Sequence, residues 1–245
     1  MPLLLPLLLA ACAATQTQEY GLEVLAEHPH DTGAYTQGLF FHDGRLHEST
    51  GHYGRSSFRR DVSLETGGYA QKLDFEDRYF VEGSVILDGE LFILTWREHV
   101  VFVYDAATLT FKRAHRYPRE GWGLTTDGTC LIASDGSSRI HFLDAQLKRL
   151  RSVDVKMDGE SVRLLNELEW IDGRIWANVY LEDYIVIINP DSGLVEGKID
   201  CRGLLPPSLR TRETDVLNGI AWDGERIFLT GKNWPRLYQV RLRKK

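Results

Sequence analysis

Residues 166–180 of this chain read NELEWIDGRIWANVY. Apolar side chains alternate with other side chains on both sides of Asp172 and Gly173, and a period of two is typical of β-strands. Asp-Gly between two such runs is the strongest short signal of a β-hairpin, because the turn needs a positive φ that Gly accepts without penalty. The stretch therefore predicts two antiparallel strands joined by a tight turn.

The same pattern occurs five times along the chain. Each copy has an apolar strand, a turn centred on Asp-Gly and a second strand that begins with Leu or Ile. The copies are QGLFFHDGRLHEST from Gln37, EGSVILDGELFILTW from Glu82, WGLTTDGTCLIASDG from Trp122, NELEWIDGRIWANVY from Asn166 and NGIAWDGERIFLTGK from Asn218. Their aspartates, at positions 43, 88, 127, 172 and 223, follow one another at intervals of 45, 39, 45 and 51 residues. A spacing of about 40–50 residues is typical of the blades of a β-propeller.

A third strand-like run follows each hairpin, and in three copies a more charged outer strand follows that run. The third runs are residues 58–64, 100–104, 140–143, 184–188 and 237–242. Four antiparallel strands in five copies predict an all-β fold, a single five-bladed β-propeller over residues 20–245, with no helix of useful length. Residues 20–29 precede the first copy, so we expect this N-terminal strand to close the last blade. A β-sandwich or a six-bladed ring with one eroded copy is the alternative, and five clean copies disfavour both.

The composition is that of a globular protein. Of the 245 residues, 43% are hydrophobic, which suffices for the core of one domain or at most two. The net charge of -6 supplies no basic surface for nucleic acid or anionic membranes. The three cysteines form no CxxC pair and no disulfide framework, and Cys130 and Cys201 are either paired or buried thiols. We expect a monomer.

The first twelve residues predict export. Residues 3–11, LLLPLLLAA, are far fewer than the roughly 20 apolar residues that span a bilayer, and polar sequence follows them. Leu-Ala-Ala-Cys at 9–12 resembles the box that bacterial lipoprotein signal peptidase cuts before a cysteine that is then lipidated. No Lys or Arg precedes the apolar run, so a plain secreted form is the alternative. We expect a signal peptide at 1–11, a lipidated Cys12, a tether at 12–19 and a place in the bacterial periplasm or cell envelope.

The register of the copies predicts a site. In a propeller the innermost strands run the same way, so equivalent positions form a ring at one end of the central channel. One such ring holds Gln37, Glu82, Trp122, Asn166 and Asn218, and a second ring holds Gly51, Trp96, Gly136, Tyr180 and Lys232. Polar, aromatic and cationic residues at two neighbouring levels are typical of a pocket lined for a ligand.

Metal chemistry has weaker support. The eight histidines lack metal-ligand pairing, and the chain has no HExxH, GxSxG, P-loop or EF-hand motif. Glu167 and Glu169 alternate with apolar residues, which suits a polar face or a ligand of a structural cation. The sequence therefore predicts no metal for catalysis and leaves open a structural calcium ion in the channel.

The same residues resemble the plant-and-bacterial type of glutaminyl-peptide cyclotransferase, and the resemblance covers the chain from Tyr20 onward. The matching stretches are YTQGL at 35–39, ESTG at 48–51, FVEG at 80–83, LTW at 94–96, EGWGL at 120–124, SDGS at 134–137, LNELEW at 165–170, WAN at 176–178, DVLNGIA at 215–221 and TGK at 230–232. The resemblance implies a five-bladed propeller that converts N-terminal glutamine to pyroglutamate with release of ammonia and without a catalytic zinc.

The resemblance also implies site residues. The family's catalytic glutamate falls on Glu82, and its substrate-pocket residues fall on Gln37, Phe80, Trp96, Trp122, Asn166 and Lys232. Tyr35 stands where the plant members have Phe, and Tyr180 stands where they have an indole. Both positions stay aromatic, so these departures bear on substrate preference more than on activity.

These residue types suit the implied reaction. One carboxylate, Glu82, can take a proton from the attacking amine and return one to the departing ammonia. Trp96, Trp122 and Tyr180 can fold the glutamine side chain toward attack, and Gln37, Asn166 and Lys232 can bind the amide oxygen.

The hypothesis is therefore a glutaminyl cyclase that acts on peptides or proteins with an N-terminal glutamine. The alternative is a non-catalytic binding module or scaffold of the cell envelope, since propellers often serve as scaffolds. Glu82 with aromatic neighbours distinguishes the two, because a scaffold would not need it.

Overall fold

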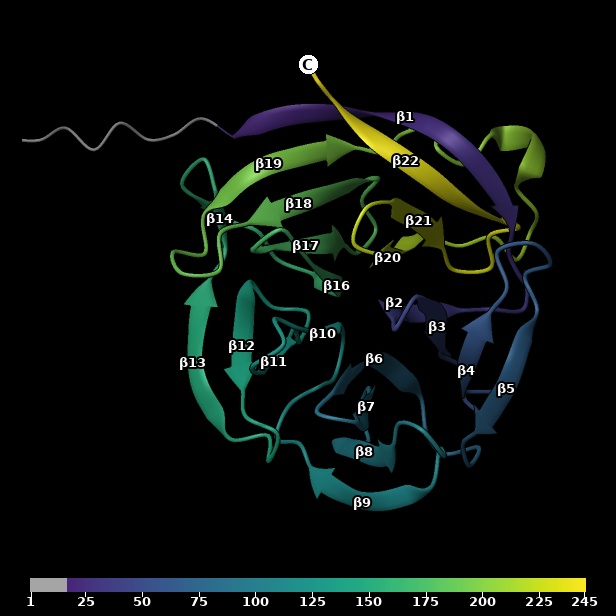
Figure 1. Ribbon diagram of the computed structural model, residues 1–245. Coiled ribbons are helices and arrows are strands. Elements are labelled where there is room, and N and C mark those ends of the chain that lie inside the picture. Colours follow the sequence, from purple (N-terminus) through teal and green to yellow (C-terminus); the bar gives the residue numbers. More distant parts are fainter. Residues whose placement is uncertain (1–16) are drawn as a thin grey trace, which may run out of the picture.

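The computed structural model describes residues 17–245, and these residues form an all-β fold with 22 strands and one short 3-10 helix, η1 (Pro207–Leu209) (Figure 1). The predicted signal peptide and Cys12 lie outside the described residues. Strand β1 (Gln18–Pro29) begins two residues before the expected domain start at Tyr20, so the end of the predicted tether belongs to the sheet. Within residues 17–245 no helix is long and apolar enough to cross a membrane.

The strands form antiparallel meanders in chain order. One sheet contains β2 (Thr36–His42), β3 (Arg45–Thr50), β4 (Ser57–Val62) and β5 (Tyr69–Asp74). The next contains β6 (Val81–Leu87), β7 (Glu90–Thr95), β8 (Val100–Asp105) and β9 (Phe111–Arg116). The third contains β10 (Leu124–Thr126), β11 (Leu131–Ala133), β12 (Arg139–Leu143) and β13 (Arg149–Asp154), and a small hairpin of β14 (Lys156–Met157) and β15 (Glu160–Ser161) follows.

The remaining strands form one eight-stranded sheet. Its order is β16-β17-β18-β19-β1-β22-β21-β20, with β16 (Leu165–Ile171), β17 (Arg174–Val179), β18 (Tyr184–Ile188), β19 (Val195–Asp200), β20 (Leu217–Trp222), β21 (Ile227–Gly231) and β22 (Arg236–Lys244). Strand β1 pairs antiparallel with β22, as predicted for the N-terminal strand, and it also pairs in parallel with β19. The two ends of the described chain are thus tied together by backbone hydrogen bonds.

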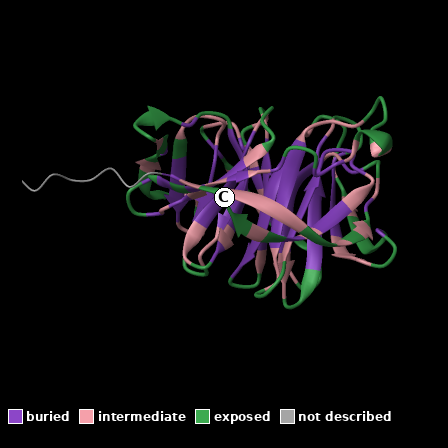
Figure 2. Cartoon of the chain, turned by 90° about the horizontal axis from the view of Figure 1, so that it is seen from above, coloured by how far each residue is buried: buried purple, intermediate pink, exposed green. Residues whose placement is uncertain are grey.

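The sheets surround a common centre, with β2, β6, β10, β16 and β20 innermost (Figure 1). These inner strands contact one another in a closed cycle: β2 with β6, β6 with β10, β10 with β16, β16 with β20 and β20 with β2. Buried residues lie along the strands in the middle of the molecule, and exposed residues lie mainly in the turns at its edges (Figure 2). The fold is therefore propeller-like.

Apolar side chains from neighbouring sheets fill the space between them. Phe40 and Phe58 of the first sheet pack with Leu91 and Ile93 of the second, and equivalent clusters lie at the other junctions. Full burial of a side chain of this size contributes about 1.5–3 kcal/mol. Cys130 and Cys201 are free, buried thiols in two different clusters, so they do not form a disulfide.

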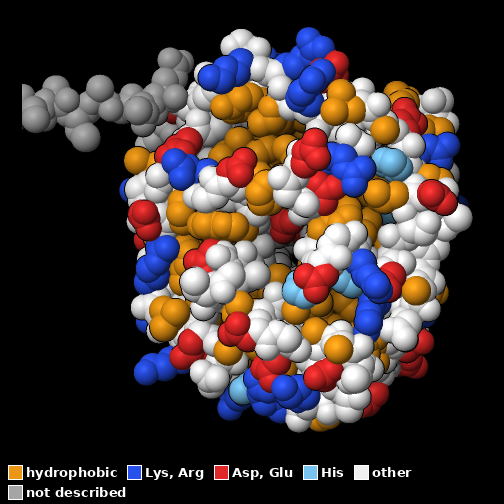
Figure 3. Space-filling model, in the orientation of Figure 1, with side chains coloured by type: hydrophobic (Ala, Val, Ile, Leu, Met, Phe, Trp, Pro, Cys, Tyr) orange, Lys and Arg blue, Asp and Glu red, His pale blue; other side chains and the backbone are white. Residues whose placement is uncertain are grey.

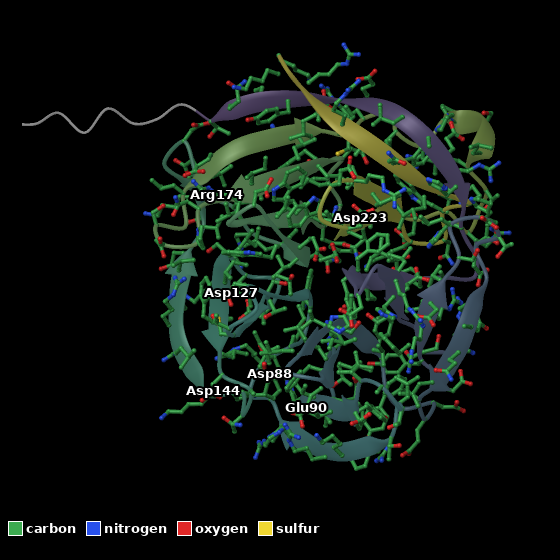
Figure 4. The ribbon with its side chains drawn as sticks, in the orientation of Figure 1. Asp88, Glu90, Asp127, Asp144, Arg174 and Asp223 are labelled. Atoms are coloured by element: carbon green, nitrogen blue, oxygen red, sulfur yellow. The ribbon has the colours of Figure 1, made fainter. Side chains whose placement is uncertain are left out.

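The Asp-Gly turns are of two kinds. Asp43, Asp88 and Asp172 have φ values of 50°, 51° and 48°, and a glycine with positive φ follows each, as in the predicted two-residue turn. Asp127 and Asp223 do not have positive φ; their carboxylates accept backbone N–H groups two and three residues further on, which closes a longer loop. In all five copies the glycine of the Asp-Gly pair has a positive φ, as the sequence predicts. Asp88, Asp127 and Asp223 come from three different sheets (Figure 4).

Glycines mark the places where inner strands approach most closely. A Cβ on Gly123 would lie 2.0 Å from the carbonyl oxygen of Asn166, and one on Gly83 would lie 2.5 Å from the backbone N of Leu124. Backbone atoms cannot move aside as the end of a side chain can. Any larger residue at these positions would force neighbouring sheets apart.

We expect Gly123→Ala to lower the free energy of unfolding by about 3 kcal/mol, because overpacking against rigid backbone is costly. Chemical denaturation measures the effect. Gly21→Ala is the matched control, since its Cβ would meet only the end of the Lys245 side chain at 3.4 Å. Equal stability of the two variants would contradict the close approach.

Candidate active site

A cavity of about 170 Å³ lies among residues of both predicted rings and their neighbours. Its walls are formed by Tyr35, Gln37, Phe80, Glu82, Trp96, Trp122, Asn166, Tyr180 and Lys232. All nine are residues that the sequence singled out, although they are spread over almost 200 positions of the chain. Asn218, which belongs to the first predicted ring, does not line the cavity.

β-Bulges set the direction of the first ring. The pairing register shifts between Thr36 and Gly38 on β2 and between Val81 and Ser84 on β6. The same shift occurs between Leu165 and Leu168 on β16 and between Leu217 and Ile220 on β20. Gln37, Glu82, Asn166 and Asn218 therefore each lie within a bulge, and a bulge turns a side chain out of the regular alternation.

Glu82 is the most strongly perturbed acid of the cavity. Its side chain is buried, with 5% of the residue exposed, and Nε2 of Gln37 donates a hydrogen bond of 3.1 Å to its Oε1. Burial raises the pKa of Glu82 well above its ordinary value, the charges of Glu120 and Glu98 raise it further, and Lys232 lowers it. A carboxyl whose pKa is raised in this way binds a proton more tightly than an exposed one.

Asn218 orients Gln37 from behind. Nδ2 of Asn218 donates to Oε1 of Gln37 at 3.3 Å and to the Thr36 carbonyl at 2.9 Å. The acceptor end of the Gln37 amide is thereby turned to Asn218, and its N–H end is turned to Glu82. Asn218 is therefore a supporting residue rather than part of the wall.

Lys232 brings a buried positive charge to the cavity. Its Nζ lies 4.7 Å from the centre of the Tyr35 ring and 5.1 Å from that of Tyr180, so two aromatic faces stabilise the ammonium. Burial lowers the pKa of Lys232, whereas Glu82 and Asp215 raise it. The hydroxyl of Tyr35 donates to Asp215 at 2.8 Å, which fixes that ring.

Two glycines of the second ring leave space for the aromatic side chains of the cavity wall. A Cβ on Gly51 would lie 2.3 Å from Phe80, and one on Gly136 would lie 2.6 Å from the Trp122 indole. These two glycines do not line the cavity; they leave room for rings that do. Trp122 and Tyr180 meet edge to face at 5.8 Å, and Phe80 and Trp96 do so at 5.5 Å.

Asn166 adds an amide to the wall. It is 2% exposed, and within residues 17–245 its Oδ1 has no hydrogen-bond partner. A buried polar atom without a partner is costly, and here it belongs to a residue of the cavity wall. The site can therefore accept a hydrogen bond from a polar ligand.

Glu167 and Glu169 use their carboxylates inside the protein. Glu167 accepts the N–H groups of Leu39 and Ile220, and Glu169 accepts that of Trp222 and the hydroxyl of Thr125. They thus link β16 to neighbouring inner strands, and they are not polar-face residues. Among the described residues, no group of three or more His, Cys, Asp or Glu that could hold a metal ion is found.

Two residues of the site were missed from the sequence. Glu120 accepts the indole N–H groups of both Trp96 and Trp122, at 2.9 and 3.1 Å, and Asp215 accepts the Tyr35 hydroxyl. Both lie in stretches that carry the family resemblance, EGWGL and DVLNGIA. That signal was available, but the repeat register places neither in a ring.

Comparisons with known proteins match this chain to one family. A family model described as glutamine cyclotransferase matches residues 3–242. A glutaminyl-peptide cyclotransferase of Arabidopsis thaliana is 42% identical over 229 residues, which are 91% of this chain and 71% of that protein. The crystal structure of Myxococcus xanthus glutaminyl cyclase matches with a TM-score of 0.86 and 35% identity, covering 94% of this chain and all of that one.

A more distant structure bears on the fold alone. The WD40 β-propeller domain of Doa1 matches with a TM-score of 0.51 and 10% identity over 83% of this chain and 62% of that one. The resemblance supports a propeller-like arrangement of the sheets.

Glu169 predicts a pH dependence of stability. Burial raises its pKa from 4.5 to about 8, so between these values the folded protein holds a proton that the unfolded chain has lost. The free energy of unfolding therefore decreases as the pH rises through this window. We expect Glu169→Gln to make that slope shallower by up to about 1.4 kcal/mol per pH unit.

Denaturation at several pH values measures the slope. Glu65→Gln, an exposed carboxylate, is the matched control and should leave it unchanged. Identical slopes for the wild type and Glu169→Gln would refute the prediction.

Proposed function

Because this chain belongs to the glutamine cyclotransferase family, we propose that it is a glutaminyl-peptide cyclotransferase, an aminoacyltransferase. It would convert the N-terminal glutamine of peptides or proteins to pyroglutamate with release of ammonia. The observation that carries the proposal is a buried carboxyl, Glu82, in the wall of a small aromatic cavity that also contains a buried ammonium, Lys232.

The reaction needs one group that both takes and gives a proton. The α-amine nitrogen attacks the side-chain amide carbon, a carbon–nitrogen bond forms, and the amine proton passes to Glu82. The tetrahedral intermediate then collapses, the bond to the amide nitrogen breaks, and Glu82 returns the proton so that ammonia leaves. Atoms and charges balance without an external reagent, so this scheme requires no cofactor.

The raised pKa of Glu82 suits this double role. A carboxylate with an ordinary pKa would be a weak base toward an amine, whereas a buried one binds the proton more tightly. The hydrogen bond from Gln37 holds the carboxylate in one orientation. Glu82 is thus preorganised to take the proton from the amine nitrogen and to deliver it to the amide nitrogen.

Negative charge develops on the amide oxygen in the intermediate, and cationic or N–H groups can stabilise it. We assign this role to Lys232, to the second hydrogen of Gln37 Nε2 and to the Asn166 amide. All three lie in the wall of the cavity. The aromatic rings exclude water around them, which strengthens each electrostatic interaction.

The size of the cavity favours a small, folded substrate group. About 170 Å³ is less than the usual range of pockets for drug-sized ligands. Trp96, Trp122 and Tyr180 can hold the glutamine side chain in the curled conformation that brings the amine to the amide carbon, which lowers the entropic part of the barrier.

The architecture fits a five-bladed propeller. Three four-stranded sheets are separate, and the eight-stranded sheet divides at the parallel pairing of β1 with β19 into two four-stranded antiparallel units. The cycle of five inner strands supports the same division. We count the second of these units, β20, β21, β22 and β1, as the blade closed by the N-terminal strand.

The cellular place is a further part of the proposal. The apolar run at 3–11 followed by Cys12 supports export and lipid anchoring to the bacterial cell envelope, with a signal at 1–11 and a tether after it.

One face of the molecule carries acidic and basic side chains interspersed rather than a basic patch, which suits a protein that does not bind nucleic acid (Figure 3). That the protein is a monomer, and that its channel holds a structural calcium ion, stay predictions.

A Gln-initiated peptide tests the activity directly. We expect the purified protein to release ammonia with the corresponding loss of peptide mass, and Glu82→Gln to lower kcat by about 10²–10⁴-fold. Glu65→Gln is the matched control and should keep wild-type turnover. Equal turnover by Glu82→Gln would exclude its role, and no turnover by the wild type would favour a binding module instead.

Lys232 predicts a shift of the pH profile. Its positive charge lowers the pKa of Glu82, so Lys232→Met should raise that pKa and move the acid limb of kcat/KM to higher pH. We also expect a loss of about 10²-fold in kcat. Lys198→Met is the matched control, because Lys198 packs over a tyrosine ring outside the cavity. An unshifted acid limb would count against the electrostatic effect of Lys232 on Glu82.

The N-terminus can be tested by mass spectrometry of the mature protein from a bacterial host. We expect a chain that begins at Cys12 with a lipid modification, and loss of that modification in Cys12→Ser. An unmodified mature N-terminus would indicate the plain secreted form.

A further inference from the structure

Glu120 lies just outside the cavity and contacts two of its walls at once. A single carboxylate oxygen, Oε2, accepts the indole N–H groups of both Trp96 and Trp122. The two tryptophans come from different sheets: Trp96 follows β7 and Trp122 precedes β10. The carboxylate is therefore a common anchor for the two rings.

The backbone beside Glu120 is tightly held. The N–H of Gly121 bonds to the carbonyls of Thr95 and Trp96, and a Cβ on Gly121 would lie 2.6 Å from the Thr95 oxygen. The loop is thus pressed against the end of β7. This contact fixes the origin of the Glu120 side chain relative to Trp96.

The other carboxylate oxygen is also used. Oε1 accepts from Nε of Arg97 at 3.3 Å, and the guanidinium of Arg97 lies 3.8 Å from the centre of the Trp96 ring. Arg97 therefore covers the face of Trp96 while Glu120 holds its edge. Trp122 is held in a similar way, with Glu120 at its edge and Gly136 against its ring.

We propose that Glu120 is a positioning residue, whose carboxylate fixes the angle between the Trp96 and Trp122 indoles and so the shape into which the glutamine side chain folds. The proposal rests on the proposed function. It concerns the walls and not the reacting atoms, because Glu120 itself does not line the cavity. Charge-assisted hydrogen bonds of this kind are about twice as strong as neutral ones.

The charge of Glu120 has a second effect that must be separated from the first. It lies close enough to Glu82 to raise the pKa of that carboxyl, and Glu98 does the same. Glu98, however, accepts from the Tyr53 hydroxyl and the Phe80 N–H and touches neither indole. Glu98 is therefore a matched control that shares the charge effect and lacks the indole contacts.

Three variants separate the two effects. Glu120→Gln and Glu98→Gln each remove one negative charge, so both should lower the pKa of Glu82 and move the acid limb of kcat/KM to lower pH. Ionisation of the substrate amine is common to all variants and cancels in the comparison. Glu120→Ala also removes the indole acceptor, and we expect it alone to raise KM about tenfold or more and to weaken the near-UV circular dichroism of the tryptophans.

Glu120→Gln keeps an oxygen that can accept an indole N–H, so it should keep most of the near-UV signal and a KM within about threefold of the wild type. If Glu120→Ala fails to fold, Glu120→Leu, which fills the same volume without an acceptor, takes its place. A wild-type KM and near-UV spectrum in these acceptor-free variants would overturn the proposal, as would an equal rise of KM in Glu98→Gln.

The near-UV measurement needs no turnover. Absence of activity in the wild type would therefore count against the proposed function, while an unchanged near-UV spectrum in Glu120→Ala would count against the positioning role. The two failures are distinguishable.

Discussion

The close approach of the inner strands is the constraint on which the rest of this structure depends. The five inner strands form a closed cycle, and at Gly83 and Gly123 the neighbouring backbone leaves no room even for a Cβ. Such contact is possible only where the chain has glycine, because any other residue would bring a Cβ into the neighbouring backbone. The residue just before each of these glycines, Glu82 or Trp122, lines the cavity.

The same constraint explains the chemistry of the site. Because the strands converge, Glu82 and Lys232 are both withdrawn from water at one end of the channel, where the pKa of the acid rises and that of the amine falls. Neighbouring side chains interact with both groups. Gln37 donates a hydrogen bond to Glu82, and the faces of Tyr35 and Tyr180 flank Lys232. The fold thereby buries two ionisable groups that would be ordinary surface charges elsewhere.

Much of this could be read from the repeats. The Asp-Gly register placed Gln37, Glu82, Trp122 and Asn166 at one level and Trp96, Tyr180 and Lys232 at another, and all seven line the cavity. The register did not identify the residues that hold a ring position but only support a neighbouring side chain. Asn218 occupies a ring position yet lies behind Gln37, and Gly51 and Gly136 make room for rings instead of contacting a ligand. Alignment of the copies shows which residues share a ring along the channel. It does not show which of them face the cavity and which are covered by a neighbouring side chain.

The sequence by itself determined the hairpins, their number, the ring positions and the pairing of the N-terminal strand, because these depend on local period, turn chemistry and repeat spacing. Only the tertiary structure decided that Asn218 lies behind Gln37, that Cys130 and Cys201 are free, and that Glu120 accepts two indole N–H groups. Each of these depends on which atoms from distant segments come within a few ångströms of one another. A carboxylate that joins two indoles from two sheets leaves no periodic trace in the chain, since the contact exists only after the sheets have closed around their common centre.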